Sequence, residues 1–499
     1  MRVSQGAGLH TSLLIIGGRN SFARTTLHED DSGRDYAIAE IRSGSKVIKG
    51  VPCWIKLPAR VDGEVAIRLE PPRDAFSEIS GEFQFELHAK RYLIDGSPLQ
   101  DIVSEKTYIT NASQFSDGRF VVDASPNDLL IKYRHRRRDP GGHAGKIYFW
   151  VSRNAQLDPH KILWPSGDGS ITVEGGQSLS CKVEKYGDVK FDTHYRSEDD
   201  GDVLRQWNHL VAELPYSEPS LDRPRIDDLA RTLEDLLAVA TFGSSEPTLW
   251  MGWELVTPET TAVFYRRDIS IPKGPSQSVA RKAVVLRGFD EFLANAYRSF
   301  AGSPSRELIK RAIWSSVGTH DAILSLSYMS MFSALEALAF SGRNRELNDP
   351  QAWLELKRRL RAAISQCPEV IKKDLIHRQL GSLNRIPFTA VWDEFVREQG
   401  LVLDDLWPMF DDGKGRIGLY EIRNKLAHGE IIQRGMHRGL SGALSSLEIT
   451  LKRTILRLLN WPIDDSQVSP EVLKENWSAV IVAEAIRKDQ ECLRRGWPK

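Results

Sequence analysis

"DAILSLSYMSMFSALEALAF" (residues 321–340) is the stretch that decides the fold of the C-terminal part of this chain. Its large apolar side chains recur at intervals of four and three residues, at Leu324, Tyr328, Met331, Leu335 and Leu338. This spacing puts them on one side of an α-helix, where they can pack against other helices. The stretch therefore predicts a helical bundle around it.

Glu336 interrupts the apolar stretch, because it stands between Leu335 and Ala337. A carboxylate without a partner is costly to bury among apolar side chains. Two interpretations follow: Glu336 lies at the edge of the apolar stripe and faces water, or it has a cationic partner. Arg423 is the candidate partner.

A second helical segment, "YEIRNKLAHGE" (residues 420–430), concentrates polar chemistry. It places Arg423, Asn424 and His428 within a few residues of one another, and Gly429 follows as a signal for the end of a helix. A histidine at that end lies beside unpaired carbonyl groups, which favour its protonated form. An always-charged arginine and a histidine that titrates near neutrality suit phosphodiester chemistry.

The spacing of Arg423 and His428 is not informative by itself, because Arg138 and His143 in "RRRDPGGH" have the same spacing. The intervening Asp-Pro-Gly-Gly predicts a tight turn between two strands, so nothing fixes the geometry of that pair. We interpret this basic hairpin tip as solvated, with phosphate contact as the alternative. The helical context distinguishes Arg423 and His428.

The N-terminal part of the chain has a different pattern. Short β-rich runs such as "DYAIAEI", "EFQFELHAKRYLI" and "KIYFWVS" alternate with turn residues between about residues 35 and 195. This pattern predicts an antiparallel sandwich or barrel-like domain over residues 1–199. Aromatic residues of these strands, with Trp150 as an example, are expected to be core rather than a binding platform.

Residues 200–301 predict a mixed α/β connecting region. "VLRQWNHLVAEL" (203–214) and "RIDDLARTLEDLLAVATF" (225–242) have helical spacing, whereas "LWMGWELVTPETTAVFYRRDISI" (249–271) resembles strands. Trp250 and Trp253 in the last stretch could form an aromatic contact surface or pack between domains.

Residues 302–499 predict an all-α bundle with C-terminal helices, so the fold class is multidomain α+β. The further helices are expected at about 351–366, 369–380, 389–399, 415–428, 440–460 and 471–494.

Composition excludes several classes of protein. The chain has 499 residues, with 67 Lys and Arg balancing 67 Asp and Glu, so no net basic field attracts nucleic acid and any phosphate site must be local. The four cysteines are far apart, which indicates neither a disulfide framework nor a metal site. The N-terminal run "SLLIIGG" is too short for a signal peptide or a membrane span. We expect a cytoplasmic protein without membrane contact.

"RNKLAHG" and "FSALEALAF" together resemble the motifs of the HEPN superfamily, over roughly residues 300–465. Intact members are commonly metal-independent endoribonucleases that act as dimers and need no cofactor. The resemblance implies that Arg423 stabilises the transition-state phosphate, that Asn424 positions it or orients the histidine, and that His428 is a general base or acid. Glu336 would orient Arg423.

Four further residues are weaker candidates for RNA binding: Lys425, Arg434, His437 and Arg438. For the last three, a solvated loop after the helix is the competing interpretation.

The layout, a β-rich N-terminal part before a HEPN-like part, is similar to that of ApeA-type abortive-infection proteins. It implies anti-phage defence by cleavage of RNA, with tRNA one candidate, and a phage-derived trigger bound by the N-terminal or middle region. Two alternatives stay open. The C-terminal part is a non-catalytic HEPN module that binds nucleotide or RNA, or dimerises, beside a ligand-sensing β domain. Otherwise the β domain carries the main activity.

Overall fold

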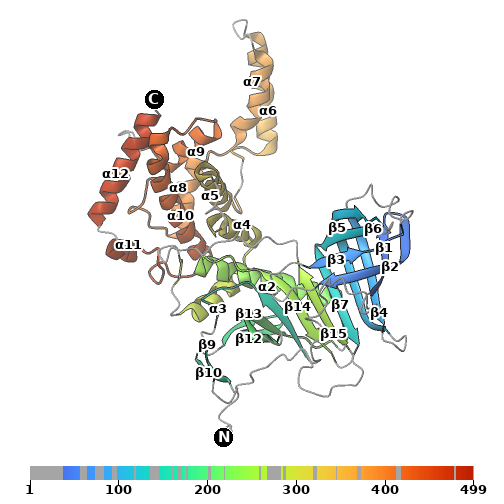
Figure 1. The fold of residues 1–499 in the computed structure, drawn as a ribbon. Helices are drawn as coiled ribbons and strands as arrows, with labels where there is room; N and C mark the ends of the chain where they lie inside the picture. The colour runs from blue at the N-terminus through green and yellow to red at the C-terminus, as the bar shows by residue number, and fades with distance from the viewer. Residues whose placement is uncertain are drawn as a thin grey trace. The chain divides into compact units, whose positions relative to one another are not determined.

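The computed structural model (Figure 1) describes residues 37–56, 65–72, 84–92, 98–116, 120–134, 145–158, 161–165, 171–175, 178–199, 204–218, 220–257, 260–266, 282–284, 288–317, 323–343, 346–367, 372–411, 417–476 and 479–497. The chain divides into two compact units. Unit 1 comprises Met1–Ala240 and Glu246–Pro275, and unit 2 comprises Thr241–Ser245 and Ser276–Lys499. The expected connecting region, 200–301, is thus shared between the two units.

Unit 1 is built on antiparallel strands, thirteen of which form one sheet within the described residues. They are β1 (Ala37–Ser43), β2 (Lys46–Lys56), β3 (Ala66–Leu69), β4 (Gln84–Tyr92), β5 (Pro98–Gln114), β6 (Phe120–Pro126), β7 (Asp128–Arg134), β8 (Lys146–Val151), β11 (Leu179–Val183), β12 (Gly187–Asp199), β13 (Leu204–Pro215), β14 (Trp250–Val256) and β15 (Thr260–Arg266). Their order is β11-β12-β13-β8-β14-β15-β7-β5-β4-β1-β2-β3-β6. In the described part of the chain, β9 (Lys161–Pro165) and β10 (Ile171–Gly175) form a separate two-stranded sheet.

The long strand β5 closes part of this sheet on itself. Its first half pairs with β7 and its second half pairs with β6, while β4 pairs along its other edge. The register of β5 and β6 shifts between Ile109 and Asn111, as a β-bulge does where a strand bends. A ring β5-β4-β1-β2-β3-β6 results, and the predicted antiparallel β domain is confirmed as a barrel-like sheet.

Period-two alternation fills this barrel. In β1 every second residue is buried, at Ala37, Ala39, Ile41 and Ser43. Ala37, Ala39 and Ile41 belong to one hydrophobic cluster. This cluster also includes Leu87 of β4 and apolar side chains from β2, β3, β5, β6, β7 and β15. Cys53 lies inside the cluster, where burial raises the pKa of its thiol to about 12.

The prediction of a helix at residues 203–214 is wrong, because this segment forms strand β13. It pairs with β12 along one edge and with β8 along the other. Leu210, Val211 and Leu214 are buried, and Glu213 forms an ion pair with Lys146 at 2.6 Å. A short apolar run fits both helical and strand spacing, and two flanking strands satisfy the backbone of this one.

The aromatic residues expected in the core of unit 1 are confirmed there in part, because Trp54 and Trp150 are only half-buried. Tyr148 and Phe149 are fully buried, and Trp253 is buried in a stack on Phe264 with 5.5 Å between ring centroids. Trp250 is also buried, and its indole N–H donates to Glu234 at 3.0 Å. These tryptophans therefore pack within unit 1 and form no exposed contact surface. The predicted helix at 225–242 is confirmed within α2 (Arg223–Ser244).

Unit 2 is helical, as predicted, apart from short turns. Its helices among the described residues are α3 (Phe289–Ala301), α4 (Arg306–Val317), α5 (Leu324–Ala339), α6 (Pro350–Gln366), α7 (Lys373–Gln379), α8 (Phe388–Gln399), α9 (Leu419–Ala427), α10 (His437–Leu458), α11 (Pro470–Asn476) and α12 (Ala479–Gly496), with the 3-10 turns η2 (Leu380–Asn384) and η3 (Arg434–Met436). The single helix expected at 471–494 comprises α11 and α12. Helix α10 contacts α3, α4, α5, α8 and α12, so it is the central helix.

Arg453 on α10 is fully buried, which is unusual for a charged side chain. Its Nη1 and Nη2 donate to the two carboxylate oxygens of Asp405 at 2.6 and 2.7 Å. Nη1 and Nε also donate to the backbone carbonyls of Val402 and Val468, both at 2.7 Å. One guanidinium thus fixes two loop segments to the central helix.

Some sequence predictions concern residues that the structure does not describe. The run "SLLIIGG" and the whole of "RRRDPGGH", including Arg138 and His143, lie outside the described residues. Within the described part of the chain, no helix is long and apolar enough to cross a membrane.

Replacing Asp405 by alanine should leave the buried Arg453 charge without its carboxylate. We expect the free energy of unfolding of unit 2 to fall by about 3 kcal/mol, as for other buried pairs that lose one partner. Urea denaturation monitored by circular dichroism measures this change. The control is Asp404→Ala, an exposed neighbour, which should cost less than about 0.5 kcal/mol. Equal unfolding midpoints for the two variants would contradict this role of Arg453.

Candidate functional site

Helix α9 carries the polar motif, and the segment before it fixes its first turn. The backbone N–H groups of Leu419 and Tyr420 donate to the carbonyls of Pro408 and Met409 at 3.0 and 2.9 Å. These bonds satisfy amides that the first turn of a helix leaves unpaired. Gly418 permits this approach, because a Cβ there would lie 2.5 Å from the carbonyl carbon of Phe410.

Helix α5 holds α9 from the side through a buried tyrosine. The Tyr328 hydroxyl donates to the Leu419 carbonyl at 2.8 Å, and both residues are fully buried. Burial raises the pKa of Tyr328 well above its usual value, so the hydroxyl keeps its proton and remains a donor. Tyr328 was expected only as a packing residue of the α5 stripe, so its hydrogen bond is a finding of the structure.

Arg423 connects the two sequence motifs. Its Nη2 donates to Glu336 Oε2 at 3.1 Å and its Nη1 donates to Asn424 Oδ1 at 3.0 Å. The guanidinium also lies 6.0 Å above the ring of Phe332. Arg423 is therefore the partner of Glu336, as predicted from the sequence, across 87 positions of the chain.

This pair is neither fully buried nor fully exposed. The side chains of Arg423 and Glu336 retain 28% and 27% of their accessible surface. Arg423 Nε is buried and has no hydrogen-bond partner among the described residues. The guanidinium is thus fixed on one side by Glu336, Asn424 and Phe332, and its exposed part can still meet an anion.

Gly429 ends helix α9 in the way predicted. It has φ of 79°, and the Gly429 and Glu430 N–H groups donate to the Leu426 and Lys425 carbonyls at 3.1 Å each. This pair of bonds is a Schellman motif with His428 as the C-cap. His428 is exposed at the negative end of the helix dipole, and its imidazole makes no hydrogen bond to any described residue.

The weaker candidates divide into separate environments. Lys425 Nζ lies 3.2 Å from both Glu430 carboxylate oxygens and 5.7 Å above the Trp497 ring, so it is already engaged within unit 2. Arg438 Nε donates to Asp489 on α12 at 3.2 Å. His437 is exposed at the start of α10, and only the backbone of Arg434 is described, in η3.

Sequence reasoning assigned no role to three residues that shape this site. Tyr328 was expected only in the apolar stripe of α5, Phe332 belongs to the same apolar stretch, and Trp497 lies about seventy residues beyond the motif. An aromatic stripe carries no sequence signal for a hydrogen bond or a cation–π contact. The arrangement as a whole is a fixed arginine and an exposed histidine at one helix end, a set suited to binding an anion and moving a proton.

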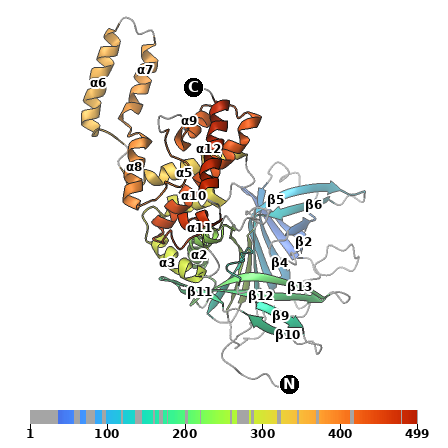
Figure 2. The same ribbon diagram turned by 90° about the vertical axis from the view of Figure 1, so that its left-hand side faces the viewer.

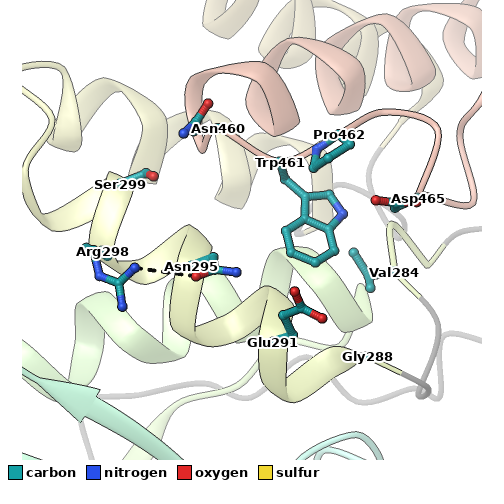
Figure 3. A pocket seen from close by; sticks show the side chains of 10 residues that line it. All are labelled: Val284, Gly288, Glu291, Asn295, Arg298, Ser299, Asn460, Trp461, Pro462 and Asp465. Carbon is teal, nitrogen blue, oxygen red and sulfur yellow. Dashed lines mark hydrogen bonds between the residues drawn. The ribbon is translucent and has the colours of Figure 1, made fainter.

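Unit 2 also contains a pocket, of about 740 Å³, between α3 and the loop after α10. Figure 3 shows Glu291 on α3 directed toward Trp461, while the guanidinium of Arg298 is hydrogen-bonded to Asn295 on the same helix. The predicted catalytic residues do not line this pocket, so it is a separate feature. Within the described part of the chain, no cluster of three or more His, Cys, Asp or Glu side chains could hold a metal ion.

Comparison with known proteins adds no assignment to this geometry. No protein-family model matches the chain, no curated protein is significantly similar to it, and no solved structure matches it.

Two glycines flank α9, and alanine should harm each of them for a different reason. Gly429→Ala should cost about 1 kcal/mol of stability, because the φ of 79° is unfavourable for alanine although no atom lies within 4 Å of its Cβ. Gly418→Ala should cost about 2 kcal/mol through steric overlap with Phe410.

Urea denaturation measures both effects, and Gly429→Asn is the matched control. Asparagine tolerates positive φ better than alanine, so this variant should retain more stability than Gly429→Ala. Equal stability of Gly429→Ala and wild type would show that the helix end is not constrained as described.

Proposed function

We propose that this protein is a metal-independent endoribonuclease of the HEPN type, with Arg423, Asn424, His428 and Glu336 as its site. The observation that carries the proposal is the bond from Arg423 to Glu336, at 3.1 Å. It joins the two motifs on which the HEPN resemblance rests. Arg423 precedes His428 by five residues, and His428 is exposed at the end of the same helix.

In the proposed reaction, the RNA 2′-oxygen attacks the adjacent phosphorus and the P–O5′ bond breaks. A general base takes the 2′-hydroxyl proton, and a general acid gives a proton to the leaving 5′-oxygen. The products are a 2′,3′-cyclic phosphate and a 5′-hydroxyl. Arg423 would stabilise the negative charge that develops on the phosphoryl oxygens, and Glu336 would act as its positioning residue.

One chain supplies one motif histidine, whereas this reaction needs both a base and an acid. We therefore propose a homodimer through the C-terminal helices, in which two copies of α9 face one substrate. The exposed position of His428 and the absence of a hydrogen bond to any described residue leave its imidazole accessible to such a partner or to RNA.

The proposed biological role is anti-phage defence by abortive infection in the cytoplasm, with RNA as substrate and tRNA as one candidate. A phage-derived trigger would bind the N-terminal or middle region. The support for this role is the layout of a β-rich domain before a helical unit with the HEPN-like motif.

One observation favours a second function. A catalytic histidine is usually oriented by a hydrogen bond, and His428 makes none to the described residues. This favours a non-catalytic module that binds nucleotide or RNA, or dimerises, beside a ligand-sensing β domain. The weaker candidates Lys425, Arg434, His437 and Arg438 would then belong to the binding surface.

The two functions differ in the behaviour of purified variants. We expect His428→Ala and Arg423→Ala each to reduce RNA cleavage at least 100-fold, because each removes a group that acts in the transition state. The assay follows degradation of total RNA and of tRNA in excess EDTA. Circular dichroism should show that both variants remain folded.

His88→Ala is the control, because His88 is a partly exposed histidine on β4 of unit 1 and has no place in the proposed site. It should retain wild-type cleavage within about twofold. Equal losses in His428→Ala and His88→Ala would contradict the assignment of His428, and wild-type cleavage that requires a divalent metal would contradict the class of enzyme.

A further inference from the structure

Helices α6 and α7 form, with the 3-10 turn η2, a helical hairpin that we call the arm; its described residues are 350–367 and 372–384. Figures 1 and 2 show α6 and α7 side by side, directed away from the other helices of unit 2. Helix α6 contains no buried residue, and the helix that it packs against is α7. The arm therefore adds nothing to the core of unit 2 along the length of α6.

Hydrogen bonds join the two chain segments at the base of the arm. Asn384 is buried, its carbonyl accepts from Leu347 N–H at 2.8 Å, and its side-chain oxygen accepts from the backbone N–H of Asn348 at 2.9 Å. Glu346 and Arg385 form a β-bridge beside it. The two ends of the hairpin are thus tied together, and the arm leaves unit 2 from a fixed point.

Local interactions stabilise α6 in place of burial. Asp349 caps its first turn by accepting from Gln351 and Ala352 N–H groups at 2.9 and 3.0 Å. Glu355 accepts from Arg358 and Arg359, and these bonds lower the pKa of its carboxyl to about 2. A helix that is well capped but has no fully buried residue is suited to present its surface to a partner.

The surface that α6 presents is basic. Residues 350–384 contain seven Lys and Arg against three Asp and Glu, a net charge of +4 in a chain whose net charge is zero. Arg358 and Arg359 retain 77% and 75% of their side-chain surface, and Arg361 is also exposed. Glu355 accounts for one negative charge on this face, so the three arginines still leave an excess of positive charge.

We propose that the arm binds the phosphate backbone of RNA and holds the substrate of the helical unit. This inference rests on the proposed function for the identity of the partner, and on the charge of the arm for its chemistry. Helix α6 has 17 residues and is therefore about 25 Å long, enough for its arginines to contact several phosphates. The contacts are electrostatic, so they give affinity without reading sequence.

A second copy of this chain is the competing occupant, because Leu354 and Leu356 are exposed on the same helix. Charge decides against it, since two copies of a basic arm repel each other unless an acidic surface intervenes. The experiment below separates the two occupants.

The test variant is Arg358→Gln, Arg359→Gln and Arg361→Gln combined in a full-length chain that also carries His428→Ala, so that RNA is not cut. The matched control makes the same change of charge on α12, with Arg487→Gln, Lys488→Gln and Arg495→Gln. Lys488 and Arg495 are likewise exposed partners of glutamates four residues earlier. Fluorescence anisotropy measures binding to a labelled 20-nucleotide RNA at several salt concentrations.

We expect the arm variant to weaken RNA binding at least tenfold and to reduce the slope of log Kd against log salt by about 2, because up to three phosphate contacts are lost. The control should stay within twofold of the His428→Ala parent. Equal affinities of the arm variant and the control would overturn the proposal. A change in the sedimentation of the arm variant without RNA would overturn it in favour of a second copy.

Failure of the proposed function is distinguishable from failure of this inference. Loss of RNA binding in the arm variant, with no cleavage by the wild-type protein, supports RNA binding by the arm and rejects the proposed nuclease activity. Unchanged RNA binding in the arm variant, with cleavage that depends on His428, supports the nuclease and rejects RNA binding by the arm.

Discussion

The buried guanidinium of Arg453 is the interaction on which the helical unit depends. It carries a charge with no solvent exposure, and it can do so because Asp405 and two backbone carbonyls pair with it. Asp405 lies in the segment that continues to Pro408 and Met409, whose carbonyls hold the first turn of α9. A contact inside the core thus determines where the helix with the polar motif begins.

From that starting point, α9 has little freedom to rotate. Tyr328 binds its first residue, and Glu336 binds Arg423 one turn later. Both belong to α5, so one packed helix sets the position and the rotation of the other. The opposite end of α9 differs, because Gly429 stops the helix and leaves His428 exposed. A fixed arginine and an accessible histidine on the same helix are the physical basis of the proposed chemistry.

The sequence predicted those parts of the fold that depend on local patterns. The apolar stripe of α5, the glycine end of α9 and the β-rich run of β1 were recognisable because neighbours along the chain determine them. The pairing of Glu336 with Arg423 was also predicted, because a carboxylate in an apolar stretch needs a partner. Strand β13 was mistaken for a helix, since the strands that flank it are distant in sequence. The long strand β5, the buried partner of Arg453 and the hydroxyl contact of Tyr328 depend on the folded chain and had no local signal.

The central claim is that Arg423 and His428 cleave RNA through attack by its own 2′-hydroxyl. The most direct measurement is the chemistry of the RNA ends that the purified full-length protein produces in excess EDTA. The account predicts 2′,3′-cyclic phosphates and 5′-hydroxyls, and neither end in the presence of His428→Ala. Products with 5′-phosphates and 3′-hydroxyls, or ends that are the same with and without His428, would contradict it.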